Sequence, residues 1–274
     1  MKHTIVTLAQ LVLISAVLAT PVASKGEKKT GHNAPETEVI KRVYDVGKNA
    51  RLSLANLNGT ATITGWDKNT IEVTATKRAN ARERLADATV QFDLLDDHLR
   101  VEVVYDFGHG DDFNGNDGLV SVDFEIRVPR HVDIRRVELV NGGIDVSDLT
   151  GDVRVSSVNG DVMGEKLSGE TRLSTVNGDV SLSSVKGHDS IELSSVNGSV
   201  TLYLPPNANA KLSASTVHGD IRGDLGHGVT HAGSSIDAVL GNGGPRIGLG
   251  TVNGDIRIRR AGSEQRGDVD DDSD

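Results

Sequence analysis

The sequence predicts an all-β protein whose second half is a β-solenoid, a single-chain, β-helix-like stack of coils of about 18 residues each. Three observations predict this fold. Turn glycines recur at a step of nine residues, apolar residues follow them at fixed offsets, and Asn-Gly pairs mark every second turn. The glycines that keep this step are Gly142, Gly151, Gly160, Gly169, Gly178 and Gly187.

Apolar residues stand two, four and seven positions after the turn glycines. After Gly142 these positions hold Ile144, Val146 and Leu149. The first two share one face of a strand, because side chains alternate along a strand. The odd step to the third requires a bend that returns it to that face. We therefore expect each unit to be a short strand, a corner and a turn with three side chains in a common core. The rule also places Val158 and Val176 in that core.

The Asn-Gly pairs are expected to form the tight turns, because Asn and Gly tolerate positive φ angles best. Coils stacked at ~4.8 Å would give every strand a partner above and below and would align the asparagines, with His218, in one column. A Gly-rich excursion at 223–250 precedes the last coil at 251–259. The predicted structural turns are Asn141, Gly142, Asn159, Gly160, Asn177, Gly178, Asn197, Gly198, Asn253 and Gly254.

Residues 1–24 have the features of a secretory signal peptide. Lys2 precedes an apolar run from Ile5 to Ala19, and small residues close the segment at Ser24. The apolar run is shorter than the ~20 residues that a spanning helix needs, and no later run is apolar, so we expect no membrane span after cleavage. Residues 25–35 are polar and linker-like. The mature chain is therefore expected in the periplasm or outside the cell.

Residues 36–130 are rich in predicted strands but lack the nine-residue step. The segment Arg51 to Leu57 alternates apolar and polar residues, and the charged segment Lys77 to Asp87 is long enough for a short helix. We expect this irregular N-terminal β region to cap one end of the solenoid, because an open coil leaves unpaired strand edges. The solenoid spans 131–260, and the acidic residues 261–274 are expected to form a disordered tail.

Composition excludes several classes of function. The absence of cysteine rules out disulfides, thiolate nucleophiles and zinc-thiolate sites. A formal net charge of −10 repels phosphate backbones, and few aromatic side chains are available to stack on bases, so a nucleic-acid partner is not expected. The sequence shows no catalytic constellation and no cofactor motif, so we expect neither enzymatic activity nor a cofactor.

A family resemblance rests on two groups of residues. The first is Gly59-Thr60-Ala61-Thr62-Ile63-Thr64-Gly65-Trp66-Asp67 followed by Ile71-Glu72-Val73, and the second is the Val-Asn-Gly-Asp-Val copies within 157–162 and 175–180. Together they resemble a large bacterial family of β-strand-repeat proteins labelled as proposed adhesins of unknown function. The resemblance covers roughly residues 38–260. It implies a secreted or envelope-facing β-solenoid without established catalysis, linked in some members with regulation of cell-envelope stress.

An acidic loop at 108–118 is a candidate calcium site, because it offers the hard oxygen ligands that calcium prefers. It does not fit an EF-hand, since Asp117 and Asp123 stand where Gly and Glu are required and strands flank it. We favour a solvated hairpin loop and keep calcium as the alternative. The candidate ligands are Asp111, Asp112, Asn114, Asn116 and Asp117.

Two polar columns are expected to run along the stack. An Asp column follows the turn glycines at positions 161, 179, 220 and 255, and hydrogen bonding within the turns explains it better than a ladder of cations. A Ser/Thr strip forms either a candidate binding surface for glycans or a plain solvent-facing β surface. The strip comprises Ser156, Ser157, Ser174, Thr175, Ser194, Ser195, Ser215 and Thr216.

The leading functional hypothesis is a non-enzymatic, periplasmic or secreted β-solenoid that acts as an adhesin-like or structural interaction module of the cell envelope. Its expected partner is a glycan or an envelope or surface protein. One alternative is a sensor or regulatory partner in cell-envelope stress, which the resemblance permits. Another is a carbohydrate-active β-helix enzyme, which 18-residue coils without a cleft of concentrated carboxylates disfavour.

Overall fold

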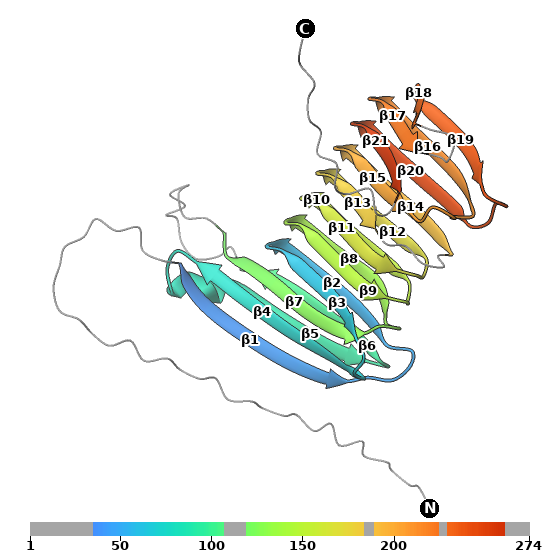
Figure 1. Ribbon diagram of the computed structural model, residues 1–274. Coiled ribbons are helices and arrows are strands. Elements are labelled where there is room, and N and C mark those ends of the chain that lie inside the picture. Colours follow the sequence, from blue (N-terminus) through green and yellow to red (C-terminus); the bar gives the residue numbers. More distant parts are fainter. Residues whose placement is uncertain (1–34, 107–118, 184–188, 225–228, 261–274) are drawn as a thin grey trace, which may run out of the picture. The chain divides into compact units, whose positions relative to one another are not determined.

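The computed structural model describes residues 35–106, 119–183, 189–224 and 229–260. These residues form two long sheets that face each other across one hydrophobic core (Figure 1). We call the eleven-stranded sheet sheet A and the ten-stranded sheet sheet B. The predicted all-β solenoid is confirmed. The predicted signal peptide, linker and acidic tail lie outside the described residues.

Sheet A runs from the N-terminal strands to the C-terminal ones. In spatial order its strands are β1 (Glu36–Asp45), β4 (Thr70–Ala79), β7 (Ser121–Pro129), β3 (Ala61–Trp66), β9 (Ile144–Leu149), β11 (Val162–Leu167), β13 (Val180–Ser183), β15 (Val200–Leu204), β21 (Ile256–Arg260), β17 (Ile221–Asp224) and β18 (Val229–Ala232).

Sheet B follows the same direction on the other side of the core. From the N-terminal end its strands are β5 (Ala88–Leu95), β6 (His98–Tyr105), β2 (Arg51–Asn58), β8 (Asp133–Asn141), β10 (Val153–Asn159), β12 (Thr171–Asn177), β14 (Ser190–Asn197), β20 (Arg246–Asn253), β16 (Ala210–His218) and β19 (Ser235–Leu240).

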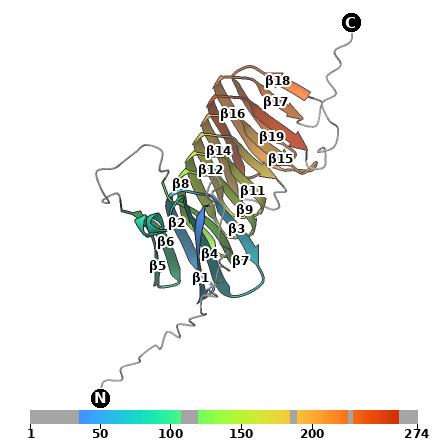
Figure 2. The ribbon, with the colours of Figure 1, turned by 90° about the vertical axis from the view of Figure 1, so that its left-hand side faces the viewer.

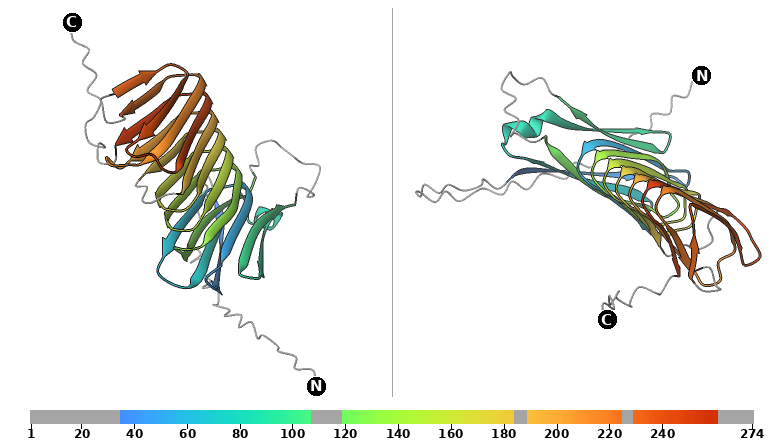
Figure 3. Two further views of the ribbon diagram at one scale, coloured as in Figure 1. Left: turned by 90° about the vertical axis from the view of Figure 1, so that its right-hand side faces the viewer. Right: turned by 90° about the horizontal axis from the view of Figure 1, so that it is seen from above.

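Each coil consists of one strand in sheet B, an Asn-Gly turn and one strand in sheet A. The successive coils β8–β9, β10–β11, β12–β13 and β14–β15 pair in parallel. Between β10, β12 and β14 the register matches equivalent positions, so that Val155, Leu173 and Leu193 lie side by side. A view along the stack shows the two sheets as the long sides of flattened coils (Figure 3). The predicted in-register stacking is therefore present over these four coils.

The bend predicted between the fourth and seventh positions occurs in sheet A. Asp148 and Lys166 have φ angles of 60° and 54°, a left-handed conformation that turns the chain at the end of β9 and β11. The next residues, Leu149 and Leu167, are fully buried. The corner therefore returns the third apolar side chain to the core, as the sequence pattern predicts.

The same prediction is wrong in sheet B. Val158 and Val176 are 38% and 39% exposed, whereas the preceding residues Ser157 and Thr175 are buried. The longer strands of sheet B continue without a bend up to the Asn-Gly turn, so the alternation of period two puts the sixth position inside and the seventh outside.

The order of the last coils also differs from the expected one. Strand β20 pairs with β14 on one side and with β16 on the other, and β21 lies likewise between β15 and β17. The final coil of the chain is thus inserted between two coils that precede it in sequence. Asn253 consequently lies between Asn197 and His218 in the column. Repeat spacing fixes the register of a coil but not its place in the stack.

The N-terminal region continues both sheets. Strands β2 and β3 form a further coil around Asn58-Gly59, and Asn58 pairs with Asn141. Beyond this coil the pairing becomes partly antiparallel, with β1 and β5 at the edges (Figure 2). Instead of the short helix expected at 77–87, β4 extends to Ala79 and a 3-10 helix covers Glu83–Asp87. Residue 130 therefore does not mark an end of either sheet.

Candidate functional site

The Asn-Gly turns stack into a ladder of side-chain hydrogen bonds along one edge of the molecule. In each step the amide Nδ2 of one asparagine donates to Oδ1 of its neighbour over 2.8 Å. None of these asparagines has a positive φ, so they support the turn through the ladder and not through the backbone conformation. The ladder connects Asn141, Asn159, Asn177, Asn197 and Asn253.

The turn glycines carry the unusual backbone conformation. Gly160 and Gly178 have φ angles of 155° and 150°. A Cβ atom at Gly178 would lie 2.4 Å from the carbonyl oxygen of Gly160, well inside van der Waals contact. Both the conformation and the close approach of neighbouring backbones therefore require glycine at this place in each coil.

Half of the predicted Ser/Thr strip is inside the protein. Ser157, Thr175 and Ser195 are each 4% exposed. Their hydroxyl groups donate to the carbonyl oxygens of the turn glycines of the preceding coil over 2.8 Å. Thr216 and Thr251 make the equivalent bonds. These hydroxyls satisfy buried backbone acceptors, so Ser157, Thr175, Ser195 and Thr216 do not belong to a binding surface.

The remaining serines lie on the outer face of sheet B and form what we call the serine row: Ser156, Ser174, Ser194 and Ser215. Gly250 interrupts it between the last two. Two residues further along the strands runs a second row of exposed side chains, the valine row. It comprises Val140, Val158, Val176, Val196, Val252 and Val217.

The Asp column hydrogen-bonds to the backbone of adjacent turns. Oδ1 of Asp161 accepts from the N–H of Asp179 over 2.8 Å, and Oδ1 of Asp255 accepts from the N–H of Asp220 over 3.1 Å. The N–H of Ser199 is bonded to Asp179 in the same way. Ser199 separates the two pairs of carboxylates, so the four Asp residues do not form one continuous ladder.

One acidic side chain next to this column has a perturbed pKa. Burial, and to a lesser extent the negative charge of Asp161, raises the pKa of Asp145. The five candidate calcium ligands between 111 and 117 lie outside the described residues. Within the ranges that the structure describes, no group of three or more His, Asp or Glu side chains is arranged to hold a metal ion.

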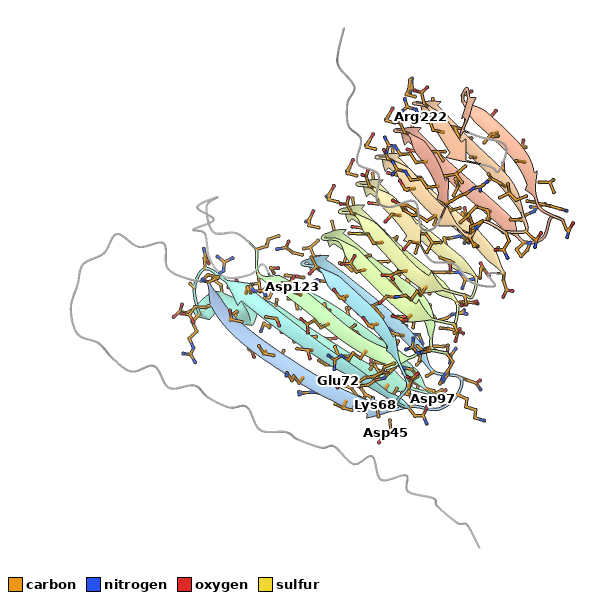
Figure 4. The ribbon with its side chains drawn as sticks, viewed as in Figure 1. Asp45, Lys68, Glu72, Asp97, Asp123 and Arg222 are labelled. Carbon is orange, nitrogen blue, oxygen red and sulfur yellow. The ribbon has the colours of Figure 1, made fainter. Side chains whose placement is uncertain are left out.

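A shallow depression of about 490 Å³ lies where loops meet at one end of the N-terminal strands. Its lining residues are Val46, Gly47, Lys48, Asn69 and His131. Asp97 stabilises the loop at the edge of the depression, because its Oδ1 accepts a hydrogen bond from the N–H of Gly47 over 3.2 Å. Figure 4 shows Asp45, Lys68 and Asp97 at this end of the strands and Asp123 at the other.

The sequence pattern did not reveal this depression because three separate loops contribute to it. The sequence pattern also did not reveal a pair of side chains on the outer face of sheet B. Ser53 on β2 and His98 on β6 approach to 2.8 Å between Oγ and Nε2, although 45 residues separate them in sequence. Only the pairing of β2 with β6 brings them together.

Several solved structures are similar to this chain at low sequence identity. A proposed cell adhesion protein of Clostridium sporogenes is 13% identical, with a TM-score of 0.47 over 83% of this chain and 100% of that one. A proposed adhesin of Bacteroides fragilis is 14% identical, with a TM-score of 0.38 over 81% and 97%. A proposed adhesin of Parabacteroides merdae is 13% identical, with a TM-score of 0.41 over 80% and 78%.

A search of curated proteins finds no match. The described part of the chain contains no helix with the length and apolar character that a membrane crossing requires. The family described as Toastrack DUF4097, a domain of unknown function, matches residues 114–259, which is more than half of the chain. This match confirms the family resemblance that the strand repeats predict. The chain belongs to the Toastrack DUF4097 family.

Proposed function

We propose that this protein is a non-enzymatic interaction module of the bacterial cell envelope, periplasmic or secreted, that makes adhesin-like contacts through the outer face of sheet B. The observation that carries the proposal is the valine row beside the serine row. Five of its six valines are 37–39% exposed and the sixth, Val217, is 63% exposed. Exposed apolar side chains in a regular row are a typical feature of contact surfaces.

The two rows suit an extended or repetitive partner. Serine hydroxyls offer both hydrogen-bond donors and acceptors, and valine methyl groups offer apolar contact, at a repeat of ~4.8 Å along the stack. An envelope glycan or a surface protein presents both kinds of group. The surface is preformed by the stacked coils, so little ordering of side chains would oppose binding.

The localisation and the lack of catalysis rest on separate observations. Residues 1–24 have the pattern of a secretory signal peptide, which supports export of the mature chain. The depression at the strand ends is shallow and contains no paired carboxylates, which favours binding over glycoside hydrolysis.

A pull-down from envelope fractions tests the proposal. The purified chain with Ser156→Lys and Ser194→Lys is compared with the unmodified chain. The control variant carries Thr62→Lys and Ser181→Lys on the outer face of sheet A, so that both variants add the same charge. We expect the sheet B variant to lose most of its captured partner and the sheet A variant to retain it. Equal capture by both variants would refute the assignment of the face.

The assay for catalysis is run on the same material. Incubation with envelope polysaccharides is followed by measurement of reducing ends and unsaturated products. We expect binding without product formation. Continuous, catalytic formation of reducing ends or unsaturated products by the unmodified chain would overturn the proposal that the protein is not an enzyme.

A further inference from the structure

The outer face of sheet B has a distinct character at its N-terminal end, where β6, β2 and β8 lie side by side (Figure 3). Ser53 and His98 are joined by the 2.8 Å contact between Oγ and Nε2. In the register of β2 and β6, Arg51 lies opposite His98 and Arg100 lies opposite Ser53. Two arginines therefore flank the Ser-His pair from two different strands.

A β-bulge in β8 adds two more arginines to the same place. Leu52 pairs with Ile134 but Ser53 pairs with Arg136, so that Arg135 is an extra residue without a partner on β2. The pairing with β10 shifts at the same point. Arg135 and Arg136 are consecutive and both exposed, which an unbroken alternation would not allow. Bulges commonly re-aim side chains at sites of function.

The resulting group has more positive charge than nearby carboxylates neutralise. Arg136 forms an ion pair with Glu138 over 2.6 Å. Arg51, Arg100 and Arg135, in contrast, form no ion pair with any carboxylate of the described residues. We call the six residues the arginine cluster: Arg51, Ser53, His98, Arg100, Arg135 and Arg136.

Two carboxylates lie opposite the cluster in the strand register. Asp93 on β5 is opposite Arg100, and Asp133 on β8 is opposite Arg51. Oδ1 of Asp133 is already engaged by the N–H of Asp152 over 3.1 Å. Neither carboxylate lies within ion-pair distance of Arg51, Arg100 or Arg135. Nη2 of Arg51 donates to the backbone carbonyl oxygen of Asp96 over 3.3 Å, which leaves its other guanidinium donors and those of Arg100 and Arg135 for a ligand.

The pKa of His98 reflects the positive charge of the arginines around it. Burial lowers the pKa of His98, and the charges of Arg51, Arg100 and Arg135 lower it further. The lowered pKa favours the neutral imidazole. Arginines on three strands, Arg51 on β2, Arg100 on β6 and Arg135 on β8, contribute to this shift.

We propose that the arginine cluster is a binding site for a phosphate group carried by a ligand. Guanidinium groups bind phosphate through paired, parallel hydrogen bonds, and they are the preferred side chains for this task. A phosphate dianion balances the uncompensated arginines better than a single carboxylate does. In the tautomer whose proton is on Nε2, His98 donates to Oγ of Ser53, and the Ser53 hydroxyl proton is then a further donor to the phosphate. On a chain with a net charge of −10 such a site is a local exception that favours an anion.

The proposal is independent of the proposed function, because it concerns other side chains and a different measurement. The phosphate binds at β6, β2 and β8, whereas the serine and valine rows begin at β10 and β8 and extend toward β16. Loss of envelope capture by the Ser156→Lys and Ser194→Lys variant bears on those rows alone. Binding of phosphate to the purified chain bears on the arginine cluster alone.

The test uses inorganic phosphate and the purified full chain at low ionic strength, because salt screens such contacts. Affinity is measured by calorimetry for the unmodified chain, for Arg100→Gln with Arg135→Gln, and for a control with Arg154→Gln and Arg172→Gln. The control removes the same charge from the same face, but its arginines are already paired with Glu170 and Glu192. We expect at least a tenfold loss in the first variant and less than a twofold change in the control.

The NMR titration of His98 provides a second readout. Phosphate is expected to raise the pKa of His98 in the unmodified chain, because a nearby negative charge favours the imidazolium. Arg100→Gln with Arg135→Gln should abolish this phosphate effect, and thermal unfolding verifies that the variant is folded. The proposal is overturned if the unmodified chain shows no binding at millimolar phosphate, or if both arginine variants weaken binding equally.

A third arm identifies the source of the phosphate group. Sedimentation with phosphatidic acid vesicles, whose headgroup is a phosphomonoester, compared with phosphatidylcholine vesicles, reports binding to a lipid headgroup. Retention on the anionic vesicles that Arg100→Gln with Arg135→Gln eliminates supports the site with a lipid as its ligand. Binding of inorganic phosphate without retention on vesicles supports the site with a soluble phosphorylated ligand.

Discussion

The residue that matters most to each turn is glycine, and its neighbours explain why. The backbone of each turn approaches the turn below so closely that no side chain fits between them. The buried hydroxyl one coil further along then donates to the glycine carbonyl, as Thr175 does to Gly160. A single turn thus combines a positive φ, a close backbone contact and a satisfied buried acceptor.

Gly178→Ala is expected to lower the free energy of unfolding by more than about 1 kcal/mol. The strained backbone conformation alone costs about 1–3 kcal/mol. The added Cβ would also overlap the carbonyl of Gly160, so the neighbouring turn must shift. Urea denaturation followed by circular dichroism measures the difference.

Gly250→Ala is the matched control for this change. Gly250 lies on the outer face of sheet B, its φ is not positive, and a Cβ there would meet nothing within 4 Å. Its stability should equal or slightly exceed that of the unmodified chain, since alanine restricts the unfolded state. If the two variants are equally stable, the close packing of the turns is wrong.

At the scale of elements, the nine-residue step predicts the strands but not their shape. Leu149 and Val158 occupy the same position after a turn glycine, yet only Leu149 is buried. The difference lies in Asp148, whose left-handed conformation bends β9, whereas β10 has no equivalent bend. The apolar residues alone do not distinguish a bent strand from a straight one, because both present them at the same offsets. The sixth position does differ, since it is charged in the bent strand, at Asp148, and a hydroxyl residue in the straight one, at Ser157.

The candidate site was predictable to a similar extent. The serine row follows from the repeat, since Ser156 and Ser174 occupy equivalent positions in neighbouring coils. The arginine cluster does not, because His98 reaches Ser53 only through pairing between segments 45 residues apart. The bulge at Arg135 likewise depends on the partners of β8 on both sides and not on its own sequence.

The inserted coil β20–β21 is an element whose removal should have a local effect. A chain that ends at residue 245 lacks β20, the strand that lies between β14 and β16 and pairs with both. We expect the backbone amides of β16 and β19 to exchange hydrogen rapidly in this shortened chain, because their contact with the stack runs through β20, while β10 and β12 remain protected.

A chain that ends at residue 260 is the control, since it keeps β21 complete and lacks only the acidic tail. Its exchange pattern should match that of the full chain, as measured by mass spectrometry. Undiminished protection of β16 in the chain that ends at 245 would show that the inserted coil does not hold the C-terminal strands.

At the scale of the whole molecule, both ends of the stack end in antiparallel strands. Strands β1 and β5 lie at one end, and β18 and β19 lie at the other (Figure 1). If the stack consisted of parallel coils alone, each end would expose unpaired strand edges of the repeat. Such edges can pair with the strands of another molecule. The antiparallel pairs interrupt the repeat at both ends of the stack.

The stack also includes a coil that lies before the region of the family match. The family match begins at residue 114, although the coil β2–β3 lies before it. That coil keeps its Asn-Gly turn and pairs in parallel with β8, in register on either side of the bulge at Arg135. The fold is therefore one continuous stack, in which the local sequence pattern determines the turns, while the long-range pairing determines the order of the coils and the surfaces they form.

The central claim is that the coils stack in register with the last coil inserted, and cysteine crosslinking tests it most directly in this cysteine-free chain. Val196→Cys with Val252→Cys places thiols on adjacent strands, ~4.8 Å apart at Cα and within disulfide range. Val196→Cys with Val217→Cys places them two strands apart, at ~9.6 Å and beyond that range. We predict rapid intramolecular oxidation of the first pair only, and crosslinking of the second pair in place of the first would contradict the account.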